Sequence, residues 1–194
     1  VAEITATDVT LDGVVITNAR HSAIGNGLYA GSVADGLRLL NCTFTHNEPS
    51  ANHANGGGAA FVSCSVFMSN CLFDANQSIP ASHLYEGGGG FYANGADVVI
   101  VDCVFTNNGN KHANSRDGNN GGGFYAVNGS LAVTDTVFAN NGFYGRSGDY
   151  NGGGAGRLLG VNPAHFSDCL FASNYVWSTT DRNTSGGGMV IEGG

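Results

Sequence analysis

The sequence predicts an all-β fold in which about six coils, one repeat of 29–34 residues each, stack as a single-stranded parallel β-helix, or solenoid. A Phe-x-x-Asn motif recurs five times, with steps of 29, 32, 33 and 33 residues between the phenylalanines. A run of glycines follows each copy, and the segments between are rich in β-branched and aromatic residues. Helical periodicity is absent. A fixed period of this size is typical of units that bury a face only against their neighbours.

The repeat can be followed along the whole chain. Its phenylalanines are Phe44, Phe73, Phe105, Phe138 and Phe171, and its asparagines are Asn47, Asn76, Asn108, Asn141 and Asn174. A sixth, less regular copy is expected upstream, with Asp12, Val15 and Asn18 in the places of an acid, the phenylalanine and the asparagine. The chain is then a single array with repeats of approximately 1–30, 31–62, 63–93, 94–127, 128–159 and 160–194. We expect it to be a segment of a longer array or a polymerising subunit.

The segment between each glycine run and the next Phe-x-x-Asn is expected to form two short strands joined by a bend, as in residues 91–105. Parallel stacking at about 4.7–4.9 Å per coil would place equivalent residues above one another in a rod of roughly 25–30 Å. Asparagine suits a repeated corner, because a stacked amide donates to one copy and accepts from the other. Glycine suits another corner, because it adopts positive φ without a Cβ clash.

The composition excludes some functions. Lysine and arginine number 7 against 15 acids, for a net charge of −8, so the basic surface that nucleic-acid phosphates require is missing. No stretch approaches the roughly 20 apolar residues that span a bilayer. We therefore expect no nucleic-acid partner and no membrane span.

Alternation of Phe-x-x-Asn with Gly-Gly followed by a small or aliphatic residue resembles the repeat of chlamydial polymorphic outer-membrane proteins and related β-helix surface proteins, over about 180 residues. This chain departs from that pattern in having a third glycine, as in Gly121–Gly123. The resemblance implies a right-handed coil and, less directly, a place at the cell surface and a role in adhesion.

Cysteine nearly fills the position two residues before each phenylalanine. The members are Cys42, Cys71, Cys103 and Cys169, with Thr136 in the remaining repeat. Residues i and i+2 of a strand share a face, so we expect these thiols to be small buried side chains beside the phenylalanines. Disulfides between coils and zinc binding are not expected.

An acidic column precedes the cysteines, formed by Asp102, Asp135 and Asp168 and continued by Asn70 and Asn41. Stacked carboxylates repel one another unless something compensates them. Bound Ca²⁺ would do so with oxygen ligands alone, and so would a strand-entry turn of the kind that Asp and Asn commonly form. The turn is the preferred interpretation, so no cofactor is expected and the three aspartates are a weak Ca²⁺ candidate.

The variable loop between each asparagine and the next glycine run is expected to emerge on one side of the rod, where solenoids concentrate function. The residues that could form a ligand face there are His53, His112, Arg116, Asp117, Tyr144, Arg146, Asp149, Tyr150, Trp177 and Arg182. Aromatic rings and bidentate polar groups could bind a surface glycan, whereas simple solvated loops are the alternative. Asn183 lies in a glycosylation sequon and is the candidate acceptor.

The function expected from these features is structural and non-catalytic. We expect an extracellular or cell-surface β-helix that associates head to tail into a filament or forms part of a longer stalk or adhesin. The competing hypothesis is a carbohydrate-binding or polysaccharide-degrading β-helix, a lyase or hydrolase acting through acids such as Asp117 and Asp149. No catalytic residue is assigned.

Overall fold

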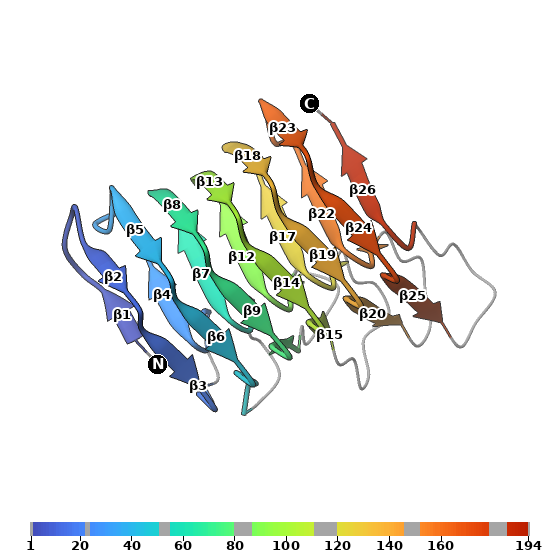
Figure 1. Cartoon of the computed structure of the whole chain (residues 1–194), viewed down its shortest axis with the longest axis horizontal. Coiled ribbons are helices and arrows are strands. Elements are labelled where there is room, and N and C mark those ends of the chain that lie inside the picture. The colour runs from blue at the N-terminus through green and yellow to red at the C-terminus, as the bar shows by residue number, and fades with distance from the viewer. Residues whose placement is uncertain are drawn as a thin grey trace.

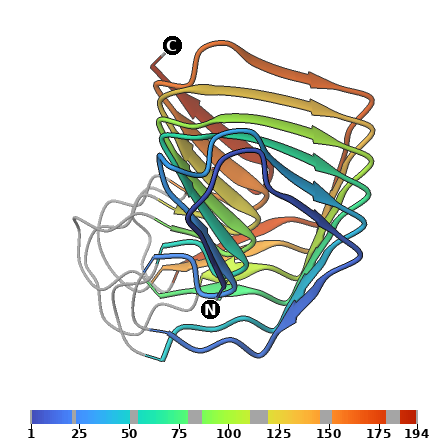
Figure 2. The ribbon, with the colours of Figure 1, turned by 90° about the vertical axis from the view of Figure 1, so that its left-hand side faces the viewer.

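The protein is an all-β parallel solenoid, and its computed structural model describes residues 2–21, 24–50, 55–79, 87–110, 120–145, 152–178 and 186–193. Successive coils lie one on the next from the N-terminal to the C-terminal end (Figures 1 and 2). Every strand pairing is parallel. The described residues contain no helix, and hence none long and apolar enough to cross a membrane.

Three long sheets run the length of the solenoid. Sheet I contains β1 (Ala2–Ile4), β4 (Leu28–Ala30), β7 (Ala59–Val62), β12 (Phe91–Asn94), β17 (Phe124–Val127), β22 (Gly156–Leu159) and β26 (Met189–Glu192). Sheet II contains β2 (Thr10–Asp12), β5 (Leu37–Leu40), β8 (Ser65–Ser69), β13 (Asp97–Val101), β18 (Ser130–Thr134) and β23 (Ala164–Ser167). Sheet III contains β3 (Val15–Thr17), β6 (Thr43–Thr45), β9 (Leu72–Asp74), β14 (Val104–Thr106), β19 (Val137–Ala139) and β24 (Leu170–Ala172).

Two short sheets lie on either side of the variable segments in the sequence. Sheet IV contains β10 (Gln77–Ser78), β15 (Gly109–Asn110), β20 (Gly142–Gly145) and β25 (Tyr175–Ser178). Sheet V contains β11 (Gly87–Gly88), β16 (Asn120–Gly121) and β21 (Gly152–Gly153). The predicted fold class is confirmed, with one strand per coil in each long sheet of the described residues: six strands in sheets II and III and seven in sheet I.

The corners between strands are set by residues with positive φ. Between sheets II and III the corner residues are Asn41, Asn70, Asp102, Asp135 and Asp168, with φ between 50° and 53°. After sheet III they are Asn18, His46, Ala75, Asn107, Asn140 and Ser173, with φ of 53° or 54°. Asn and Asp adopt this left-handed conformation more readily than other residues with a Cβ. The corner between sheets II and III falls within the second of the two strands that the sequence indicated. Each coil therefore contributes three strands to the long sheets, whereas the sequence indicated two.

The upstream copy of the repeat is shifted by one residue from the expected position. β3 pairs with β6 so that Val15 lies beside Thr43, and Ile16, not Val15, lies beside Phe44. The first coil is therefore 28 residues long at this point, whereas the expected alignment assumed 29. Aliphatic residues at both 15 and 16 made the two alignments equivalent on hydrophobicity alone.

The same shift moves the asparagine and acid positions. Ala19 occupies the ladder position, because its N–H donates to Asn47 Oδ1 at 3.0 Å. Asn18 is the preceding corner residue, with φ of 54°. Gly13, with φ of 66°, takes the corner expected for Asp12.

One glycine in each of four glycine runs makes room for close packing between the backbone of the run and sheet IV. A Cβ on Gly122 would lie 2.2 Å from the Gly154 carbonyl oxygen and 2.6 Å from the Gly142 nitrogen. Equivalent clashes with backbone atoms would occur at Gly57, Gly89 and Gly154. We call this column of four the glycine seam. It brings both ends of each variable segment together at the same place on the solenoid.

Candidate functional site

The asparagine column is a continuous hydrogen-bonded ladder in the interior, as predicted. Each asparagine Nδ2 donates to the Oδ1 of the asparagine in the next coil. The distances are 2.9 Å for Asn47 to Asn76, 3.0 Å for Asn76 to Asn108, 3.0 Å for Asn108 to Asn141 and 3.1 Å for Asn141 to Asn174. Four of the five side chains are buried, and Asn174 is partly buried. A buried amide is costly unless its donors and acceptors are paired. The ladder is therefore a structural device that fixes the register of one coil on the next.

The phenylalanines form a second column beside the ladder. Adjacent rings from Phe44 to Phe171 stack with centroids 4.5–5.0 Å apart and planes within 13° of parallel. The cysteine column lies on the same inner face, and all five cysteines are free thiols. Burial raises the pKa of the Cys64 thiol to about 11 and also raises the pKa of Cys42. The thiols of Cys42 and Cys64 are therefore protonated at neutral pH and poorly nucleophilic.

The acidic column is exposed at the corner between sheets II and III. Asp102, Asp135 and Asp168 each hold a positive φ, which is the turn role that the sequence favoured over Ca²⁺ binding. Farther along the column, Asn70 Nδ2 donates to Asn41 Oδ1 at 2.7 Å. Among the described residues there is no group of three or more His, Cys, Asp or Glu side chains that could hold a metal ion.

Only a small part of the expected ligand face falls within the described residues. His53, His112, Arg116, Asp117, Arg146, Asp149, Tyr150 and Arg182 lie outside the described residues, as does the sequon residue Asn183. Tyr144 lies in β20 and pairs with Trp177 of β25, whose side chain is 49% exposed. Of the expected face, Trp177 alone has a described side chain, and Tyr175 lies two residues before it with 55% exposure.

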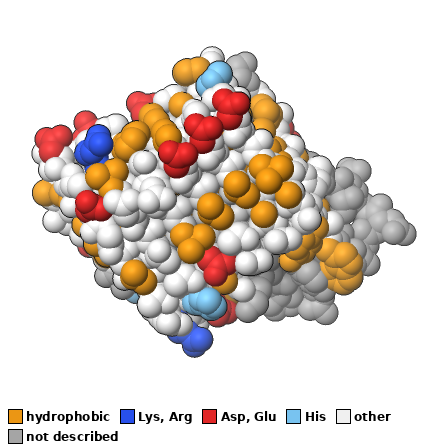
Figure 3. Space-filling model, viewed as in Figure 1, with side chains coloured by type: hydrophobic (Ala, Val, Ile, Leu, Met, Phe, Trp, Pro, Cys, Tyr) orange, Lys and Arg blue, Asp and Glu red, His pale blue; other side chains and the backbone are white. Residues whose placement is uncertain are grey.

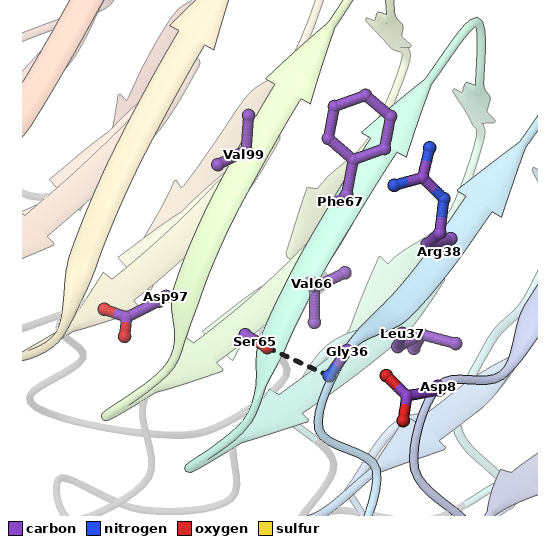
Figure 4. A pocket seen from close by; sticks show the side chains of 9 residues that line it. All are labelled: Asp8, Gly36, Leu37, Arg38, Ser65, Val66, Phe67, Asp97 and Val99. Carbon is purple, nitrogen blue, oxygen red and sulfur yellow. Dashed lines mark hydrogen bonds between the residues drawn. The ribbon is translucent and has the colours of Figure 1, made fainter.

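An open groove of about 390 Å³ lies on the outer face of sheet II, which the sequence did not indicate (Figure 4). It passes over Gly36 and Ser65, which occupy the same position in two neighbouring coils. Their small size leaves a gap between Asp8 on one side and Asp97 on the other. The Gly36 N–H donates to Ser65 Oγ at 2.9 Å. Beside this gap the Arg38 guanidinium lies over the Phe67 ring, 4.7 Å from its centroid.

The serine in the groove is not arranged as an activated nucleophile. The Ser65 hydroxyl donates to Asp35, and this bond, together with the Ser65 N–H, lowers the pKa of that carboxyl. A carboxylate of lowered pKa is a weak base and would not activate the serine. The residues lining the groove include neither histidine nor cysteine. We therefore assign the groove no chemistry.

The edge of the solenoid nearest the C-terminus exposes residues that are buried elsewhere. Ile191 of β26 is 63% exposed, although its register partner Leu158 is only 1% exposed. Phe171 and Met189 likewise are only partly buried against the core. We define the C-terminal edge as the free edges of β23, β24 and β26. Unpaired strand edges of this kind are sites where further strands add.

The outer face of sheet III also carries hydrophobic side chains. Figure 3 shows them running across the face, with a row of acidic side chains beside them. Val15, Val104 and Leu170 are the most exposed members. The comparisons with known proteins add no site assignment, since no protein-family model, curated protein or solved structure matches this chain.

Proposed function

We propose that this protein is a non-catalytic structural solenoid that is extended by the stacking of further coils on its edges. The observation that supports this is the C-terminal edge, where core positions such as Ile191 are exposed and the last described strands of sheets I, II and III each have one free edge. The interior behind this edge consists of repeating columns that have no intrinsic end. The stack can therefore grow by one coil at a time without a new type of contact.

The extension takes one of two forms, copy on copy in a filament or coil after coil in a longer stalk or adhesin. The filament form requires β1 of the incoming copy to detach from its own sheet I, because β26 of the other copy already occupies that position in the stack. Copies should therefore associate reversibly. The resemblance of the repeat to surface β-helix proteins supports an extracellular or cell-surface location.

The test is end-to-end association measured by sedimentation velocity and electron microscopy. We expect wild-type particles to lengthen along one axis as concentration rises, and Ile191→Lys to prevent this by placing a charge on the edge. Val99→Lys is the matched control, because Val99 is 41% exposed on the outer face of sheet II, away from either edge. Particles that stay monodisperse, or an Ile191→Lys variant that assembles like the wild type, would contradict the filament form.

A second candidate function, binding of a surface glycan, is favoured by one observation. Tyr175 and Trp177 alternate along β25 and therefore share a face, with 55% and 49% of their surfaces exposed. Aromatic faces of this kind stack on sugar rings. We expect Trp177→Ala to lower retention on a polysaccharide affinity gel at least tenfold and Trp177→Phe to preserve it, and wild-type protein retained by none of several neutral and acidic polymers would exclude this function.

A further inference from the structure

The asparagine ladder has a direction. Asn108 Oδ1 accepts two bonds from the coil before it, from the main-chain N–H of Asn76 at 3.0 Å and from its Nδ2 at 3.0 Å. Asn108 in turn donates its own main-chain N–H and Nδ2 to Asn141 Oδ1, at 3.1 Å and 3.0 Å. Each step of the ladder therefore joins two donors of one coil to one oxygen of the next.

At the C-terminal edge this direction leaves donors exposed. Asn174 Oδ1 is used, since it accepts the main-chain N–H and Nδ2 of Asn141 at 3.0 Å and 3.1 Å. Asn174 Nδ2 donates to the Phe138 carbonyl oxygen at 2.8 Å, and its second hydrogen, like the Asn174 main-chain N–H, has no acceptor among the described residues. If another coil covered this edge without supplying an oxygen there, both donors would be buried unpaired, which is strongly unfavourable.

The position next to this edge fits one strand-corner-strand segment. β26 adds to sheet I beyond β22, whereas sheets II and III end at β23 and β24 among the described residues. Residues 97–109 are such a segment within the solenoid, because they contribute β13, β14 and the ladder residue Asn108. A segment of this kind laid against β23 and β24 would place its phenylalanine on Phe171 and its asparagine on Asn174.

The first coil of this chain does not provide that oxygen. Residues 8–20 occupy the same positions as residues 97–109, and their ladder residue is Ala19. Ile16 in this segment would still cover Phe171, but alanine offers no side-chain acceptor. A second copy stacked in register would therefore bury the two Asn174 donors without partners.

We infer that the C-terminal edge binds a parallel coil carrying a side-chain carboxamide at the ladder position, in preference to the first coil of another copy. This inference rests on the proposed stacking function and names the partner of that edge. The apolar contacts supply affinity, and the Asn174 donors supply selectivity, because mispaired polar groups discriminate more sharply than apolar contacts.

The test uses the whole protein and three fluorescently labelled peptides of 13 residues each, under reducing conditions. One has the sequence of residues 97–109, the second carries Asn108→Leu in that sequence, and the third has the sequence of residues 8–20. We expect fluorescence anisotropy to show that the first peptide binds at least tenfold more tightly than either of the others. Leucine is close to asparagine in size, so the second peptide isolates the loss of the carboxamide.

A protein variant identifies the groups that discriminate. Asn174→Asp keeps the oxygens that Asn141 requires but replaces the Nδ2 donor with an oxygen, which loses the bond to the Phe138 carbonyl and repels the incoming oxygen. We expect this variant to be folded by circular dichroism and to lose most of its preference for the first peptide over the second, because only the main-chain N–H of residue 174 remains as a donor. Retention of the tenfold preference in Asn174→Asp, or equal binding of all three peptides by the wild type, would overturn the inference.

The same experiment separates this inference from the proposed function. If the peptide of residues 8–20 binds most tightly, the inference fails while end-to-end stacking of copies stands. If no peptide binds and the protein also shows no concentration-dependent association, both fail.

Discussion

Single residues with unusual backbone or burial requirements determine how this chain coils. Asn76, Asn108 and Asn141 are buried and fully engaged, whereas Asn70, Asn107 and Asn140 stand at exposed corners with positive φ. The two groups have the same side chain for different reasons. The first needs an amide that donates and accepts, and the second needs a residue that tolerates the left-handed conformation.

Removal of one interior ladder residue should destabilise the fold severely. Asn108→Leu deletes the oxygen that accepts two bonds from Asn76 and the donors used by Asn141 and the Phe73 carbonyl. Because several buried groups lose their partners together, we expect a loss of about 3 kcal/mol or more in the free energy of unfolding. Urea denaturation measures it.

The adjacent corner residue provides the control for that variant. Asn107→Gly keeps a residue suited to φ of 54° and removes only an exposed bond to Asp74. It should change the free energy of unfolding by about 0.5 kcal/mol or less. If the two variants lose similar stability, the ladder does not hold the coils as described.

The buried thiol of Cys64 predicts a loss of stability at alkaline pH. Burial raises the pKa of Cys64 from 9.0 to about 11 in the folded protein, so the unfolded chain releases this proton first as pH rises. The contribution of the protonated Cys64 thiol to the free energy of unfolding is therefore fully present below about pH 9. It falls by up to about 2 kcal/mol as pH rises to about 11. Urea unfolding at a series of pH values should show a smaller decline in Cys64→Ala, and an unchanged decline would contradict this assignment.

At the scale of elements, the glycine seam allows two strands of one coil to approach backbone to backbone. Sheet IV strands such as β20 lie directly against the glycine run of the same coil. A side chain at Gly122 would meet main-chain atoms on both the neighbouring coil and β20. Main-chain atoms cannot rotate away as a side-chain terminus can. The seam therefore requires glycine for space, at positions without positive φ.

Substitutions within two glycine runs test this explanation. Gly122→Ala should lower the free energy of unfolding by about 3 kcal/mol or more, because overpacking against backbone is relieved only by moving a coil. Gly188→Ala is the matched control, since a Cβ there has no atom within 4 Å. Thermal and urea unfolding should show almost no change for the control, and equal effects of the two substitutions would exclude the steric explanation.

Comparison of sequence and structure at this scale shows what repetition can predict. Residues that recur at the same place in every coil, such as Phe105 and Asn108, were placed correctly in columns because one residue type repeats there. The first coil was misplaced by one residue because Val15 and Ile16 are both aliphatic, and because Asn18 stands one residue before the ladder position, which holds Ala19. The groove over Gly36 was missed because the residues at that position of successive coils, such as Gly36, Ser65 and Asp97, differ in type. No repeated residue marks the position in the sequence.

At the scale of the whole molecule, the solenoid is a stack whose interior is repetitive and whose ends differ from each other. Among the described residues, sheet I runs from β1 to β26, and the ladder runs from the Ala19 N–H to the donors of Asn174. The two edges therefore offer different chemistry to an incoming coil. A structure of this kind grows by adding coils in one register, and the ladder supplies that register.

The most direct test of this account is hydrogen exchange of the ladder carboxamides, followed by NMR on the assigned protein. We predict that the Nδ2 hydrogens of Asn76 and Asn108 exchange only through global unfolding, because both lie inside the ladder. The free hydrogen of Asn174 Nδ2 should exchange rapidly and become protected when the peptide of residues 97–109 is added. Rapid exchange at Asn108, or no change at Asn174 with bound peptide, would contradict an account in which stacked amides fix and extend the coils.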